Sequence, residues 1–121
     1  MKLTFLYQPV DDLDAAVAFY RDTLGLDESW REGKSTAAFT LPGTEVELML
    51  DLPENGGVER RAGGFFGVDD VDRFFADHPS LEPVGGIIDV PGGRAATFLD
   101  PAGNVLRVFD QTTADPEPTP T

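Results

Sequence analysis

Val10-Asp11-Asp12-Leu13-Asp14 is the stretch that decides the fold, because it returns 58 residues later as Val68-Asp69-Asp70-Val71-Asp72. A second correspondence lies at an offset of 60 residues, where segment 39–48 aligns with segment 99–108. Both of these segments pass through a glycine-containing turn. Two correspondences in the same order predict a chain built from two modules of roughly 60 residues each.

Both modules show the same order of expected elements. Each begins with a short apolar strand that leads to a helix capped by an aspartate, and three further strands follow. The expected strands are residues 3–7, 30–32, 35–40 and 45–50 in the first module and 64–68, 83–90, 94–99 and 105–109 in the second. The sequence therefore predicts an α+β fold, with two tandem βαβββ modules forming a curved mixed sheet with a cleft.

Composition bounds the class of protein. The 121 residues suit one domain, and the absence of cysteine excludes disulfides, thiolate metal sites and a cysteine nucleophile. The net charge of −13 disfavours nucleic-acid binding and favours a cationic ligand, although an acidic surface also serves solubility alone. No apolar run approaches the ~20 residues of a membrane span, and no leader is visible, so a cytoplasmic protein without a membrane partner is expected.

The domain boundaries follow from the repeat. We predict a single domain over residues 1–111, with module one at about 1–52, a linker at 53–61 and module two at about 62–111. The last segment, 112–121, is rich in Pro, Thr and acidic residues and is predicted to be disordered.

Two stretches carry a family resemblance. Asp12-Leu13-Asp14, continued by Phe19-Tyr20-Arg21-Asp22-Thr23-Leu24-Gly25-Leu26, resembles the first-module signature of the glyoxalase / bleomycin-resistance / extradiol-dioxygenase (vicinal oxygen chelate) superfamily. Phe98-Leu99-Asp100-Pro101-Ala102-Gly103-Asn104 resembles its second-module signature. The resemblance covers about residues 3–110 and implies the fold; the superfamily contains isomerases, dioxygenases and metal-free drug-binding proteins.

The resemblance also implies where a metal would bind. Metal enzymes of this superfamily hold a divalent ion with a His near the first strand and a Glu on the last strand of each module. The corresponding positions here are Phe5, Glu47, Gly63 and Arg107. Three of these cannot ligate, so no metal and no cofactor are expected. A guanidinium would repel a divalent ion, and a Glu47–Arg107 pair is the alternative to each side chain facing solvent alone.

Alternation along the strands places one set of mostly aromatic and apolar side chains on the face away from the helices. The candidate ligand-binding residues are Phe5, Tyr7, Trp30, Glu47, Met49, Phe65, Arg107 and Phe109. This composition suits a flat or amphipathic small molecule, although the same side chains could fill the cleft themselves, and Trp30 could serve packing alone. The single histidine, His78, falls at a helix end, and no catalytic residue is assigned.

Three functions are compatible with these residues. The favoured one is a metal-independent small-molecule binding protein that sequesters a cationic or aromatic compound such as a bleomycin-type drug. The alternatives are a metal-dependent lyase, isomerase or dioxygenase of the same superfamily and a non-catalytic accessory domain. The resemblance implies a homodimer, and whether the cleft forms within one chain or across two is left open.

Overall fold

The computed structural model describes residues 1–52 and 61–112. Two βαβββ modules and a mixed α+β fold confirm the prediction. The elements are β1 (Lys2–Pro9), α1 (Leu13–Ala18), η1 (Phe19–Thr23), β2 (Glu28–Glu32), β3 (Thr36–Thr40), β4 (Glu47–Asp51), β5 (Gly63–Gly67), α2 (Val71–Asp77), β6 (Val84–Val90), β7 (Gly93–Leu99) and β8 (Val105–Phe109). The predicted linker and tail lie outside the described residues, except for their flanking residues Arg61 and Thr112.

The chain divides into two compact units. The first comprises Leu3–Phe65, and the second comprises Met1–Lys2 and Phe66–Thr121. This division places the boundary inside β5. The single domain of residues 1–111 and the cleft between its modules therefore stay predictions.

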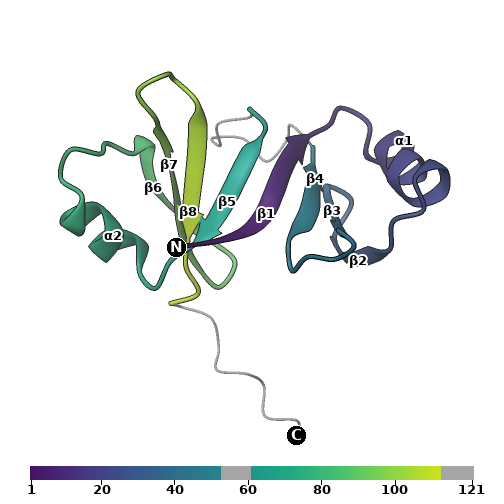
Figure 1. Cartoon of the computed structure of the whole chain (residues 1–121), viewed down its shortest axis with the longest axis horizontal. Coiled ribbons are helices and arrows are strands. Elements are labelled where there is room, and N and C mark those ends of the chain that lie inside the picture. The colour runs from purple at the N-terminus through teal and green to yellow at the C-terminus, as the bar shows by residue number, and fades with distance from the viewer. Residues whose placement is uncertain (53–60, 113–121) are drawn as a thin grey trace, which may run out of the picture. The chain divides into compact units, whose positions relative to one another are not determined.

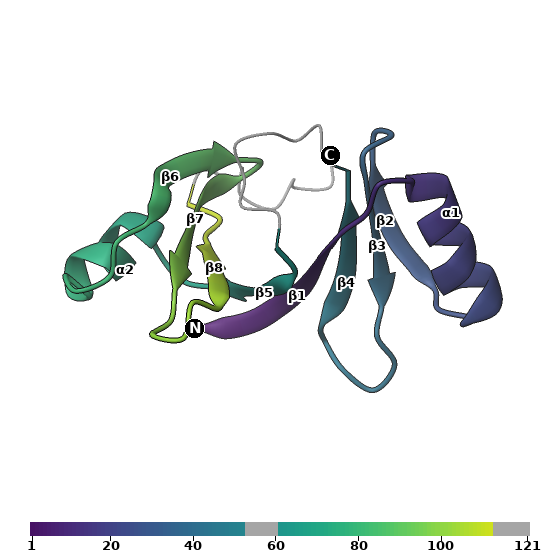
Figure 2. The same ribbon diagram turned by 90° about the horizontal axis from the view of Figure 1, so that it is seen from above.

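The first unit carries its strands in the order β2-β3-β4-β1 (Figures 1 and 2). Strands β1 and β4 pair parallel, while β3 pairs antiparallel with both β2 and β4. Helix α1 packs on one face of β3 and β4, where an apolar core excludes water. The core residues are Leu13, Val17, Ala37, Phe39, Leu48 and Leu50.

Local chemistry sets the ends of α1. The Asp12 carboxylate accepts from the Ala15 amide at 3.0 Å and caps the helix, as the sequence predicts. After Ala18 the backbone widens into the π-helical turn η1. After this turn Leu24 is 53% exposed and lies outside the core. Gly25, at φ +74°, ends the helical segment.

The second unit repeats this construction. Its strands lie in the order β8-β7-β6, and neighbouring strands pair antiparallel. Asp70 caps the first turn of α2, and its carboxylate accepts a hydrogen bond from the Arg73 amide at 3.0 Å. Residues of α2 pack on β7 and β8 around a core of Val71, Ala96, Phe98 and Val108. The equivalent caps confirm that the repeated Asp-Asp motif begins a helix in each module.

In the described part of the chain, the two helices are too short to cross a membrane, and neither offers an apolar span of the required length.

Candidate functional site

The strand register assembles one side-chain row across the first unit. Trp30 lies opposite Ala38, Ala38 opposite Met49, and Met49 opposite Tyr7. Residues opposite one another on paired strands project from the same face of a sheet. The core residues of β3 and β4 occupy the other face, against α1. The row therefore lies on the face of the sheet turned away from α1.

A second row, one pleat away, brings Glu47 beside Phe5, since these residues are register partners on β4 and β1. Phe5 packs edge to face against Trp30, with ring centroids 6.1 Å apart and an interplanar angle of 87°. This is the geometry that aromatic quadrupoles prefer. The Trp30 indole Nε1–H donates to Glu47 Oε1 at 3.2 Å. All three side chains are half-buried. We name Phe5, Trp30 and Glu47 the aromatic–carboxylate cluster.

The position of Trp30 depends on a local irregularity of β2. The β2–β3 register shifts between Glu28 and Trp30, so Glu28 pairs with Phe39 and Trp30 with its neighbour Ala38. Such a bulge redirects side chains without breaking the strand pair. The sequence of residues 28–32 does not predict this bulge. The hydrogen bond between Trp30 and Glu47 cannot be predicted from the sequence either, because the two residues are 17 positions apart.

Tyr7 belongs to the interior of the first unit. It is 3% exposed, its hydroxyl donates to Asp51 Oδ2 at 3.0 Å, and its ring packs against Phe65 at a centroid distance of 5.7 Å. The other carboxylate oxygen of Asp51 accepts from the Thr36 hydroxyl at 2.7 Å. This network satisfies buried polar groups. A ligand contact at Tyr7 or Phe65 stays a prediction.

The remaining candidates lie in the second unit. Arg107 is the central residue of β8, opposite Thr97, and is 1% exposed. Phe109, two residues on, is half-buried on the same face. Because Glu47 belongs to the first unit and Arg107 to the second, the Glu47–Arg107 pair stays a prediction.

The residues at the metal positions do not fit a divalent ion. Phe5 and Gly63 offer no side-chain donor atom, and a buried guanidinium at Arg107 carries a positive charge and no lone pair for coordination. Glu47, the fourth position, already accepts a hydrogen bond from Trp30. Within residues 1–52 and 61–112, no group of three or more His, Cys, Asp or Glu side chains is placed to hold a metal.

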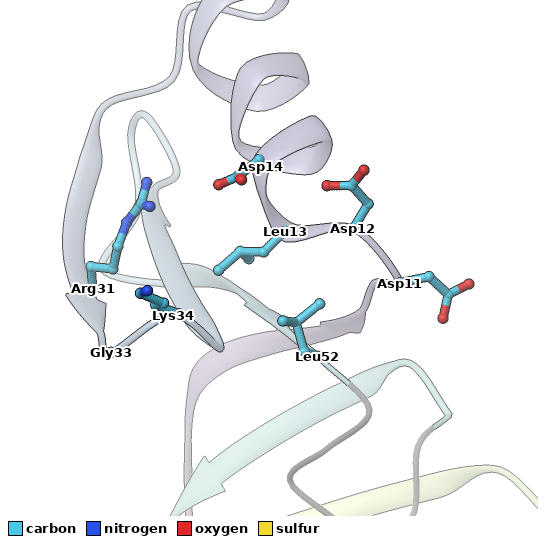
Figure 3. A pocket seen from close by; sticks show the side chains of 8 residues that line it. All are labelled: Asp11, Asp12, Leu13, Asp14, Arg31, Gly33, Lys34 and Leu52. Carbon is cyan, nitrogen blue, oxygen red and sulfur yellow. The ribbon is translucent and has the colours of Figure 1, made fainter.

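A separate groove of about 530 Å³ lies at the start of α1 (Figure 3). Asp14 points toward Arg31 of the β2–β3 hairpin and Leu13 also points toward this hairpin, whereas Asp11 and Asp12 do not. The lining residues are Asp11, Asp12, Leu13, Asp14, Arg31, Gly33, Lys34 and Leu52. Asp12 is used as the helix cap, and Arg31 makes two hydrogen bonds to Glu28 that hold the pKa of that carboxyl below its usual value. Asp12 and Arg31 therefore serve the fold.

His78 ends α2, as the sequence indicates. Its Nδ1 donates to the carbonyl oxygen of Phe74 at 2.7 Å, and its ring lies 4.5 Å from the Phe74 ring. The imidazole is exposed and completes the helix end.

Comparison with known proteins agrees with this architecture. A family model described as Glyoxalase/Bleomycin resistance protein/Dioxygenase superfamily matches residues 2–108. The chain is 32% identical over 114 residues to "Anthracycline biosynthesis protein DauV" from Streptomyces sp. (strain C5). The match covers 88% of this chain and 40% of that protein, so the chain spans less than half the length of this relative.

Solved structures share the fold at low sequence identity. A glyoxalase/bleomycin resistance protein/dioxygenase superfamily member from Vibrio splendidus 12B01 superposes with a TM-score of 0.64 at 15% identity, covering 88% of this chain and 96% of that one. Methylmalonyl-CoA epimerase from Mycobacterium tuberculosis gives 0.63 at 20% identity, covering 90% and 87%. At these identities the likeness concerns the fold alone.

Proposed function

Since this chain belongs to the Glyoxalase/Bleomycin resistance protein/Dioxygenase superfamily, we propose that it binds a flat aromatic small molecule without a metal ion. The observation that carries the proposal is the edge-to-face pair of Phe5 and Trp30. Phe5 occupies the position on the first strand at which the metal enzymes that this chain resembles carry a histidine. An aromatic contact surface thus stands in place of a metal ligand.

The chemistry of this surface suits a ring system. Aromatic side chains bury large apolar areas at low entropic cost, and their rings prefer offset or edge-to-face contact with other rings. Met49 lies on the same face, two residues from Glu47, and its flexible thioether adapts to an irregular ligand edge. The similarity to a protein of anthracycline biosynthesis makes polycyclic aromatic compounds the first class to test.

A fluorescence titration tests the proposal at the site itself. Trp30 is the only tryptophan of the chain, so its emission reports on the Phe5–Trp30 pair. We expect a neutral anthracycline aglycone to quench this emission saturably in buffer containing EDTA. The variant Phe5→Leu should weaken the affinity about fivefold, because it removes an aromatic contact worth about 1 kcal/mol beyond its area.

Phe19→Leu is the matched control. Phe19 is 49% exposed on η1 in the same unit, and its replacement should leave the titration unchanged. Equal losses in the two variants, or quenching that requires an added metal, would contradict the proposal.

Sequestration of the bound compound, rather than its conversion, is the role we propose for this binding. No catalytic residue is assigned, and the homodimer that the resemblance implies stays a prediction.

A further inference from the structure

Glu47 is a carboxylate placed among rings. Its Oε1 accepts from the Trp30 indole, its backbone is the register partner of Phe5, and its side chain is half-buried. Burying charge without compensation is unfavourable, so a carboxylate in such surroundings needs donors or a cation beside it. The indole supplies one donor and no positive charge.

The hydrogen bond from Trp30 fixes where the negative charge lies. A carboxylate has two oxygens with about four acceptor sites, and one indole N–H uses one of them. Acceptor capacity therefore remains beside the edge-to-face pair of rings. Two arginines near the start of the chain form ion pairs with other carboxylates at the surface. Arg21 pairs with Asp22, and Arg31 pairs with Glu28.

A protonated amine is the group that fits this arrangement. An ammonium donates charge-assisted hydrogen bonds to a carboxylate, and it is also attracted to the faces of tryptophan and phenylalanine rings. The net charge of −13 adds a long-range attraction for cations. A neutral or anionic substituent would leave the carboxylate uncompensated when the ligand excludes water.

We infer that Glu47, held in place by Trp30, selects ligands that carry a protonated amine next to their aromatic ring system. This rests on the proposed function, because it assumes that the rings bind at Phe5 and Trp30. It adds the substituent that strengthens binding. Glu47 is the specificity-determining residue, and Trp30 both contacts the rings and positions the carboxylate.

Two matched probes test the inference by calorimetric titration. Daunorubicin carries one protonated amine on its sugar, and N-acetyl-daunorubicin is its neutral counterpart. We expect the wild-type protein to bind the amine at least about tenfold more tightly than the amide. In Glu47→Gln this preference should fall to about one, because the amine loses its charge-assisted hydrogen bond and the neutral compound no longer leaves a carboxylate uncompensated. The neutral compound should therefore bind at least as tightly as it binds the wild type. Glutamine keeps an oxygen that can accept from Trp30, so the fold should be retained.

Glu82→Gln controls for the loss of one negative charge. Glu82 is exposed in the loop before β6, in the other unit, and its replacement should preserve the preference for the amine. A second variant, Trp30→Phe, keeps a ring and removes the donor. It should weaken binding of the amine more than it weakens binding of the neutral compound.

The outcomes separate the two proposals. If the wild type binds both probes and Glu47→Gln keeps the tenfold preference, the role of Glu47 is wrong and the aromatic site stands. If the wild type binds neither probe nor the aglycone, the proposed function itself is wrong. If Glu47→Gln does not fold, Trp30→Phe decides, and an unchanged preference in that variant overturns the inference.

Discussion

Asp110→Asn is expected to lower the free energy of unfolding by about 3 kcal/mol at neutral pH. Asp110 is 2% exposed. Its Oδ2 accepts from the Val71 amide at 2.6 Å, and its Oδ1 accepts from the Arg94 amide at 2.9 Å and the Thr112 hydroxyl at 2.9 Å. An amide group has one acceptor oxygen and would turn an NH₂ toward one of these donors. Chemical denaturation of the two proteins measures the loss.

The pH dependence of this difference has a definite sign. Burial alone raises the pKa of the Asp110 carboxyl, but hydrogen bonds from Val71, Arg94 and Thr112 outweigh burial and hold its pKa below the usual value. The stabilisation is therefore complete above the unfolded-state pKa and is lost as the pH falls through the folded-state pKa. The difference between wild type and Asp110→Asn should be largest near neutrality and shrink below about pH 4.

Asp69→Asn is the control for charge. Asp69 is exposed just before α2, and its replacement should change stability by about 0.5 kcal/mol or less at every pH. A loss for Asp110→Asn that stays the same down to pH 3 would contradict a role for the ionised carboxylate.

Gly93→Ala is expected to destabilise the second unit by about 3 kcal/mol. A Cβ at this position would lie 2.7 Å from the Asp110 carbonyl carbon and closer still to its carbonyl oxygen and Oδ1. The backbone atoms of Asp110, which directly follows β8, cannot yield as a flexible side-chain end can. The methyl group would also push the Asp110 carboxylate away from its amide donors. Thermal or denaturant unfolding measures the effect.

Gly103→Ala separates crowding from backbone conformation. Gly103 has φ +86°, and a Cβ added there would lie in open space, so alanine should cost about 1 kcal/mol through backbone strain alone. Similar losses in the two variants would show that Gly93 is not packed against Asp110 as described.

The local features of the fold are predictable from the sequence. Asp12 and Asp70 cap their helices because the capping bond joins residues three apart, which the repeated motif displays. The strand of residues 105–109 is found with its predicted bounds. The repeated motif and the strand pattern therefore identify the modules and the order of their elements.

Contacts between distant segments cannot be predicted from these local patterns. The π-helical turn that turns Leu24 outward has no periodic signal. The approach of Gly93, the first residue of β7, to Asp110, which follows β8, joins segments that are distant in the sequence. At the candidate site, Phe5, Trp30 and Glu47 are predictable as members of one face. Their hydrogen bond and ring contact depend on the β2 bulge, which the sequence does not reveal.

Thermal unfolding of EDTA-treated protein tests metal-free aromatic binding most directly. The protein is heated alone, with nickel, zinc, manganese or ferrous ions after removal of EDTA, and with the anthracycline aglycone in EDTA. A ligand of the folded state at about 100 times its Kd adds about 2.7 kcal/mol, which raises Tm by several degrees. We predict that the aglycone raises Tm saturably and that none of the four metals does. A saturable rise with a metal, and none with the aglycone, would contradict an aromatic site in place of a metal site.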